Sequence, residues 1–267
     1  MEPLETLSTQ NGLKSMKFSS LLSQTGKLWI VFLDIVYPAC CLACENSVTG
    51  QNLFCPQCWR QIRFIEEPFC QRLGMPFVTD HGDESVSPLA LQEPPDFEQA
   101  RSAVLYEGLA RDLVRQLKYH DRHDLVQGMA QLCIRAGRSL LAEADILTPV
   151  PMHPLRLWKR RFNQAMLLTH SIADLTNLPC DPFLLKRVKK SLPQYHYTRE
   201  QRRENMRGAF QIFSDQIPDK IRDKRILLID DVITSGATAN AAARILLRHG
   251  ARAVDVLTFA RTPSSAM

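Results

Sequence analysis

The sequence lacks any apolar run long enough to cross a lipid bilayer. A spanning helix needs about 20 apolar residues in succession, whereas the longest apolar stretch near the N-terminus, residues 28–37, is shorter and is interrupted by Asp34. A secretory signal is not expected either, because Glu2 and Glu5 stand where such a signal carries basic residues. We therefore expect no membrane span and a cytoplasmic location.

Two common nucleotide-binding signatures are missing as well. The chain contains neither the Walker pattern G-x-x-x-x-G-K-[ST] nor the dinucleotide fingerprint G-x-G-x-x-G. Its 267 residues are 45% hydrophobic and 23% charged, with a net charge of +5, which is the composition of a globular protein and excludes wholesale disorder. Lys and Arg gather in residues 156–161 and 186–207, where they could attract phosphate groups or nucleic acid.

The order of patterns along the chain predicts two unequal modules. Residues 1–36 read as a polar tail with a short amphipathic helix, 37–76 as a cysteine-rich module, 77–96 as a linker and 97–267 as a larger domain. In that domain we expect strands at 100–106, 146–150, 226–229 and 254–259, and helices at 109–117, 125–141, 164–175 and 239–247. This alternation predicts an α/β fold, a parallel sheet with helices on both faces.

Two C-x-x-C pairs stand in the cysteine-rich module. Cys41 and Cys44 form one pair, and Cys55 and Cys58 form the other. Four thiolates at this spacing are the tetrahedral ligand set that structural zinc prefers, whereas disulfides are rare in a reducing cytoplasm. We predict a structural zinc site here and do not count Cys70, which has no second cysteine beside it.

An acidic pair and a loop of small and hydroxyl residues follow the apolar strand at 226–229. The acids are Asp230 and Asp231, which could accept hydrogen bonds from a ribose hydroxyl pair, directly or around Mg²⁺. The predicted phosphate loop consists of Thr234, Ser235, Gly236, Ala237 and Thr238. Its backbone N–H groups and the helix start that follows suit a phosphate monoester.

This strand, acid pair and loop resemble the motif of type I phosphoribosyltransferases. The resemblance implies that Asp230 and Asp231 hold the ribose hydroxyls of phosphoribosyl pyrophosphate with Mg²⁺, and that Thr234 to Thr238 hold its 5′-phosphate. It also implies that the basic turn after the strand at 146–150, with Arg156 and Arg161, holds the pyrophosphate. Purine-salvage members carry an Asp at the position of Thr234, so purine salvage is not expected.

The basic segment 186–210 has two interpretations. It could close over the donor and bring Arg203 to the pyrophosphate, or its tyrosines and basic residues could form a surface for single-stranded DNA. No motif marks an acceptor pocket, so the sequence leaves open whether a phosphoribosyl group is transferred or only bound.

Taken together, these features resemble the ComF/GntX family, in which a zinc ribbon precedes a phosphoribosyltransferase-like domain. The resemblance rests on the paired cysteines, on residues 149–151, on 161–164, on 194–205 and on 230–238. It implies a role in natural competence, DNA uptake or DNA utilization, with single-stranded DNA and DNA-processing proteins as candidate partners. The alternative is a non-catalytic DNA-binding or recombination-protein-binding factor that uses the zinc module and the basic segment.

Overall fold

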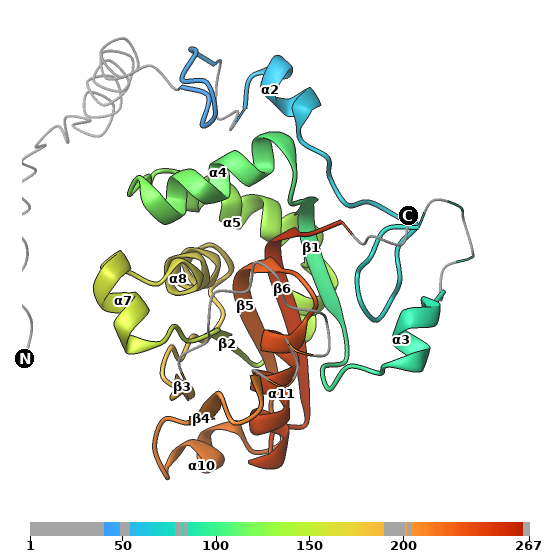
Figure 1. Ribbon diagram of the computed structural model, residues 1–267, viewed down its shortest axis with the longest axis vertical. Coiled ribbons are helices and arrows are strands. Elements are labelled where there is room, and N and C mark those ends of the chain that lie inside the picture. The colour runs from blue at the N-terminus through green and yellow to red at the C-terminus, as the bar shows by residue number, and fades with distance from the viewer. Residues whose placement is uncertain are drawn as a thin grey trace, which may run out of the picture.

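A four-stranded parallel sheet forms the centre of the molecule (Figure 1). The computed structural model describes residues 40–48, 54–77, 79, 82, 85–189, 201, 204 and 206–263. The strands stand in the order β1-β6-β5-β2, and every neighbouring pair is parallel. Their bounds are β1 Ala100–Leu105, β2 Ile146–Pro149, β5 Arg225–Ile233 and β6 Ala253–Arg261.

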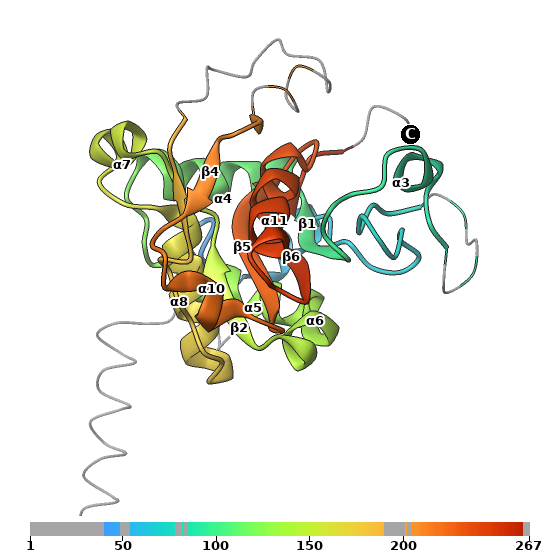
Figure 2. The same ribbon diagram turned by 90° about the horizontal axis from the view of Figure 1, so that it is seen from below.

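Helices cover both faces of this sheet (Figures 1 and 2). Alternate side chains of β5 point to opposite faces, so that Leu227 and Ile229 pack in one core cluster and Ile226 and Leu228 in the other. The first cluster takes in α4 (Gly108–Tyr119), α5 (Leu125–Ala136), α6 (Arg138–Glu143) and α8 (Gln164–Thr176), and the second takes in α10 (Ile217–Ile221) and α11 (Ala237–Arg248). The predicted α/β class is confirmed.

The helix predicted at 125–141 is broken. It ends at Ala136, and a second helix, α6, begins at Arg138. A Cβ atom added to Gly137 would lie 2.6 Å from Leu257 Cδ1 on β6, so the chain approaches the sheet closely at this point, as only a glycine allows. The prediction of one continuous helix was wrong, because the apolar periodicity continues across the break.

Several short elements lie outside the expected pattern. The segment 77–96 contains α3 (Pro88–Gln92), whose first turn is capped by the Ser87 hydroxyl accepting from the Ala90 N–H at 3.4 Å. Helix α7 (Pro154–Arg160) follows β2. A separate antiparallel pair, β3 (Leu185–Arg187) and β4 (Phe210–Ile212), lies beside α10 and α11 (Figure 1).

The cysteine-rich module lies over α4 and continues along the edge of the sheet (Figure 1). Its helix α2 (Pro56–Gln61) is followed by a segment that pairs with β1. Ile65 N donates to Ala103 O at 3.0 Å, and Leu105 N donates to Arg63 O at 2.8 Å. These bonds cover part of the outer edge of β1. Within the described part of the chain, no helix has both the length and the apolar character needed to cross a membrane.

Candidate metal centre and ligand site

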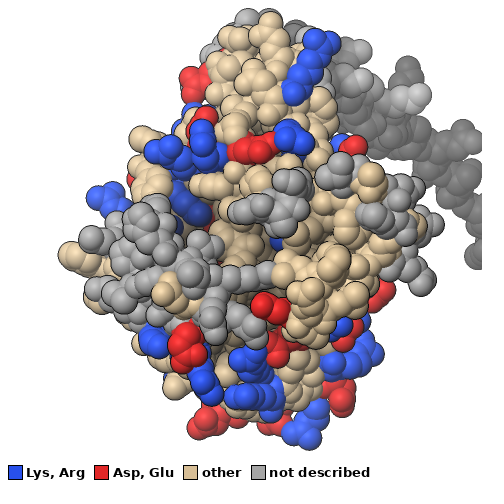
Figure 3. All heavy atoms as spheres, turned by 45° about the vertical axis from the view of Figure 1, so that its right-hand side comes forward, with Lys and Arg blue, Asp and Glu red and all other residues tan. Residues whose placement is uncertain are grey.

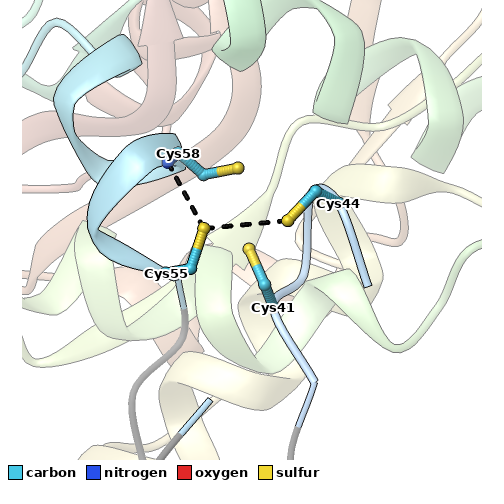
Figure 4. A group of neighbouring side chains, drawn as sticks. All are labelled: Cys41, Cys44, Cys55 and Cys58. Atoms are coloured by element: carbon cyan, nitrogen blue, oxygen red, sulfur yellow. Dashed lines mark hydrogen bonds between the residues drawn. The ribbon is translucent and has the colours of Figure 1, made fainter. Parts of the chain in front are cut away.

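The four predicted zinc ligands converge on one point (Figure 4). The Sγ atoms of Cys41, Cys44, Cys55 and Cys58 all lie within 4.8 Å of one another. Cys41, Cys55 and Cys58 are buried, whereas Cys44 is exposed. Four sulfurs at this separation fit the tetrahedral set of a structural zinc ion, and the predicted structural zinc is supported by this donor set.

Local backbone geometry brings these thiols together. Cys55 caps the N-terminus of α2, where its sulfur accepts from the Cys58 N–H at 3.5 Å. Burial raises the pKa of the Cys41 thiol, but hydrogen bonds from backbone N–H groups, that of Cys55 foremost, more than offset this and lower its pKa to about 6. Burial and the neighbouring cysteine side chains raise the pKa of the Cys58 thiol instead. Cys41 is thus the more readily ionised of the two, and the thiolate is the form that binds a metal.

Cys70 resembles half of a third C-x-x-C turn but lies outside the four-cysteine cluster. Its sulfur is fully buried and accepts from the N–H groups of Leu73 at 3.4 Å and Ser87 at 3.2 Å. Among the described residues, the only group of three or more candidate ligands is the four-cysteine cluster. That Cys70 is not a metal ligand stays a prediction.

The acidic pair lies in the C-terminal half of β5, which runs four residues beyond its predicted end at Ile229. Lys118, on the last turn of α4, forms an ion pair with Asp231. Burial opposes ionisation of Asp231, but the Lys118 ammonium more than offsets this and lowers the pKa of that carboxyl. Burial raises the pKa of the Asp230 carboxyl well above its usual range, and the charge of Asp231 adds to the effect.

The predicted phosphate loop turns from β5 into α11. Gly236 occupies the N-cap position with a φ of 77°, in the left-handed region that favours glycine. No side chain caps the first turn of α11, which leaves N–H groups without intrahelical partners. Asp230, Thr234, Gly236 and Thr238 all line a hollow of about 20 Å³. Asp230 and the loop thus border one space.

The turn after β2 begins beside Ile229 of β5, the residue before the acidic pair. The strand register pairs Pro149 with Ile229, and Val150 N donates to Ile229 O at 2.9 Å. Asn163, whose side chain caps α8, also donates to Val150 O at 3.2 Å. The structure therefore brings the predicted pyrophosphate turn next to the acidic pair, as expected where parallel strands end at one edge.

The structure describes two of the three basic residues predicted to hold the pyrophosphate. Arg156 lies on the exposed side of α7, and Arg161 ends that helix in the left-handed conformation with a φ of 65°. Arg203 lies outside the described residues, together with most of the segment that surrounds it.

The sequence interpretation missed Arg187 and Lys118. Burial lowers the pKa of Arg187 on β3, and the nearby positive charge of Arg156 lowers it further, while Asp230 acts in the opposite direction. Arg187 is thus within electrostatic range of both the acidic pair and Arg156. For Lys118 a signal was present: it stands four residues after buried Val114, in line with the apolar stripe of α4.

Comparison with known families agrees with this architecture. Residues 32–89 match the double zinc ribbon domain, and residues 183–267 match the phosphoribosyl transferase domain. The fold and the four-cysteine centre define a zinc-ribbon protein with a phosphoribosyltransferase-like domain.

Several curated proteins are similar to this chain over most of its length. The DNA utilization protein YhgH of Salmonella typhimurium is 28% identical over 91% of this chain and 100% of its own length. Competence protein F of Haemophilus influenzae is 25% identical over 83% of this chain and 96% of its own, and competence protein ComFC of Bacillus subtilis is 23% identical over 84% and 95%. Along most of its length the chain is therefore similar to competence and DNA utilization proteins of the ComF type.

Solved structures match about half of the chain. A hypoxanthine phosphoribosyltransferase from Staphylococcus aureus matches 54% of this chain and 70% of that one at 11% identity, with a TM-score of 0.33.

Proposed function

We propose that this protein binds phosphoribosyl pyrophosphate with Mg²⁺ at Asp230, Asp231 and the loop from Thr234 to Thr238, and that it acts in DNA uptake or utilization in the cytoplasm. The phosphoribosyltransferase-like domain, from residue 97 onward, supplies the ligand site. The module at residues 37–76 holds zinc and is structural.

One observation carries the proposal: two carboxylates, an uncapped helix start and the turn after β2 meet at one edge of the sheet. Each group suits a different part of the donor. Carboxylates suit ribose hydroxyls and Mg²⁺, free N–H groups suit a 5′-phosphate, and Arg156, Arg161 and Arg187 offer positive charge for a pyrophosphate. The names of the relatives support the biological setting.

Thr234 limits the chemistry that can follow binding. Its hydroxyl cannot handle a proton near a purine base in the way that a carboxylate does, and Thr234 is exposed at the start of the loop. We therefore expect no turnover of hypoxanthine or guanine. Robust turnover in an assay with phosphoribosyl pyrophosphate would show that another group takes this role.

Calorimetry with phosphoribosyl pyrophosphate and Mg²⁺ tests the site. Replacing both acids, as Asp230→Asn with Asp231→Asn, removes hydrogen bonds to charged groups that contribute about 1.5–3 kcal/mol each. We expect the affinity to fall by at least about 100-fold, with the zinc content unchanged. Asp219→Asn, at an exposed carboxyl on α10, is the matched control and should bind as the wild type does. Unchanged binding by the double variant contradicts the proposed site.

Single-stranded DNA is the second candidate ligand, and the two are compatible. The tyrosines and basic residues of the segment 186–210 favour it. On the face shown in Figure 3, however, the described basic side chains are interspersed with acidic ones and form no continuous track. The candidate predicts salt-dependent oligonucleotide binding that weakens when Arg202 and Arg203 are replaced by glutamine. If oligonucleotide binding changes neither with salt concentration nor with these substitutions, the segment 186–210 is not a surface for single-stranded DNA.

A further inference from the structure

A lysine from helix α4, far away in the sequence, forms an ion pair with one carboxylate of the acidic pair. Lys118 ends the buried stripe of α4, and its ammonium pairs with the carboxylate of Asp231 on β5. The exposed fractions of the two side chains are only 19% and 14%. Removing a lysine from water is costly unless a carboxylate compensates its charge, so each of these residues holds the other in place.

The charged groups around this pair come from three elements. Asp230 and Asp231 lie on β5, Lys118 on α4 and Arg160 on α7. The charges of Asp230 and Arg160 both affect the ionisation of the Lys118–Asp231 ion pair. Arg160 also donates to the Tyr119 hydroxyl at 3.4 Å and stands over that ring at 5.3 Å from its centroid. Lys118 and Arg160 therefore already compensate the negative charge of Asp231 from within the protein.

The ion pair between Lys118 and Asp231 affects how a divalent cation could bind at the acidic pair. The cation and the Lys118 ammonium would require the same carboxylate and would repel each other at close range. Mg²⁺ also gives up its water reluctantly and is usually held by one or two carboxylates together with the phosphates of a substrate. A cation that arrives with a pyrophosphate brings the negative charge needed to offset the lysine.

We propose that Lys118 is a positioning residue that acts as the internal counter-ion of Asp231 and prevents the acidic pair from holding a divalent cation on its own. The cation then binds only with the phosphorylated ligand. The inference rests on the proposed function, because it concerns the same two carboxylates. It adds Lys118, a residue outside the phosphoribosyltransferase motif.

Binding of Mn²⁺ alone, followed by the paramagnetic signal of the free ion, tests this inference without any donor. Lys118→Met removes the charge but keeps a side chain of similar length. We expect this variant to bind Mn²⁺ at least tenfold more tightly than the wild type, and Lys118→Arg to bind it as weakly as the wild type. Adding Asp231→Asn to Lys118→Met should abolish the gain, since the freed carboxylate is lost.

A purely structural lysine would give a different result. It would lower the thermal midpoint of Lys118→Met and leave Mn²⁺ binding unchanged, and this outcome overturns the inference. Equal tightening in Lys118→Arg overturns it too, because charge would not be the cause. If Lys118→Met does not fold, Lys118→Gln makes the same comparison. Failure of the wild type to bind phosphoribosyl pyrophosphate contradicts the proposed function separately, since the Mn²⁺ comparison uses no donor.

Discussion

Two adjacent carboxyls of β5 have opposite ionisation tendencies. Asp231 has a lowered pKa because Lys118 outweighs the effect of its burial, whereas burial and the charge of Asp231 raise the pKa of Asp230. The Asp231 N–H also donates to Asp230 Oδ1 at 2.9 Å. A substitution at one acid therefore alters the protonation of the other, and the two act as a coupled pair.

The left-handed glycine of the phosphate loop gives a prediction at the residue scale. At Gly236, with a φ of 77°, a Gly236→Ala variant should lose about 1–2 kcal/mol in the free energy of unfolding, because the added methyl group strains the turn. Donor binding should weaken as well, since the loop N–H groups would shift. Chemical denaturation and calorimetry measure the two effects.

Gly250 provides the matched control for that prediction. It follows the C-terminus of α11 with a φ of 104°, at the opposite end of that helix from the loop. Gly250→Ala should lose comparable stability but leave donor binding unchanged. Weaker donor binding in both variants would indicate that general destabilisation, rather than the shape of the loop, is responsible.

Sequence patterns predicted the acids and the loop but not their partner. Asp230 to Thr238 are contiguous, so their spacing alone carries the motif. Lys118 lies more than a hundred residues earlier, and only the tertiary fold brings it to Asp231. Arg187 was missed for another reason, because it stands among many basic residues of the segment 186–210 and no pattern distinguishes it from them.

At the scale of elements, the break between α5 and α6 depends on a single close contact. Gly137→Ala should destabilise the protein by about 1–3 kcal/mol, because its Cβ would lie 2.6 Å and 2.8 Å from the two Cδ atoms of Leu257. Leu257→Val shortens the side chain that the added methyl group at position 137 would contact. The double variant should therefore lose less stability than the sum of the two single variants in urea unfolding. Strict additivity would show that the contact is not the cause.

The zinc ribbon gives a second prediction at this scale. Elemental analysis should find one zinc ion per chain, because the described residues hold one four-cysteine cluster. Cys44→Ser removes a ligand and should lower both the zinc content and the thermal midpoint. Cys40→Ser alters an exposed neighbour outside the cluster and should retain the metal. Two zinc ions per chain would mean that the turn at Cys70 also binds metal.

The regular elements of the sheet were predictable, whereas the short ones were not. Strands β1, β2 and β6 and helices α4 and α8 carry enough apolar periodicity to be found. Strands β3 and β4 have three residues each, too few for a pattern, and they form only because distant segments pair. At Gly137 the structure ends one helix and begins another, although the apolar periodicity predicts a single continuous helix.

At the scale of the whole molecule, the cysteine-rich module and the sheet share one core. Phe54 and Ile62 pack in the same cluster as Leu227 and Phe259. The segment that follows α2 also pairs with the outer edge of β1. An exposed strand edge invites pairing with other chains, so the module shields the sheet from association.

A truncated chain tests this shielding. A protein that begins at residue 97 loses the pairing of Arg63 and Ile65 with β1 and exposes apolar surface that Phe54 and Ile62 now cover. We expect it to form soluble aggregates or to precipitate, as followed by light scattering. A monodisperse and fully folded truncated domain would show that the edge needs no cover.

Helix α4 makes one contact with the zinc module and one with β5, near its opposite ends. Its first residue, Gly108, lies near the Gln61 backbone of the zinc module, and Lys118 near its other end reaches Asp231. An α-helix turns by about 100° per residue, so inserting one residue would direct the lysine away from the carboxylate, while a full turn would lengthen the helix by about 5 Å. The length of α4 is therefore fixed by two contacts that lie at its opposite ends.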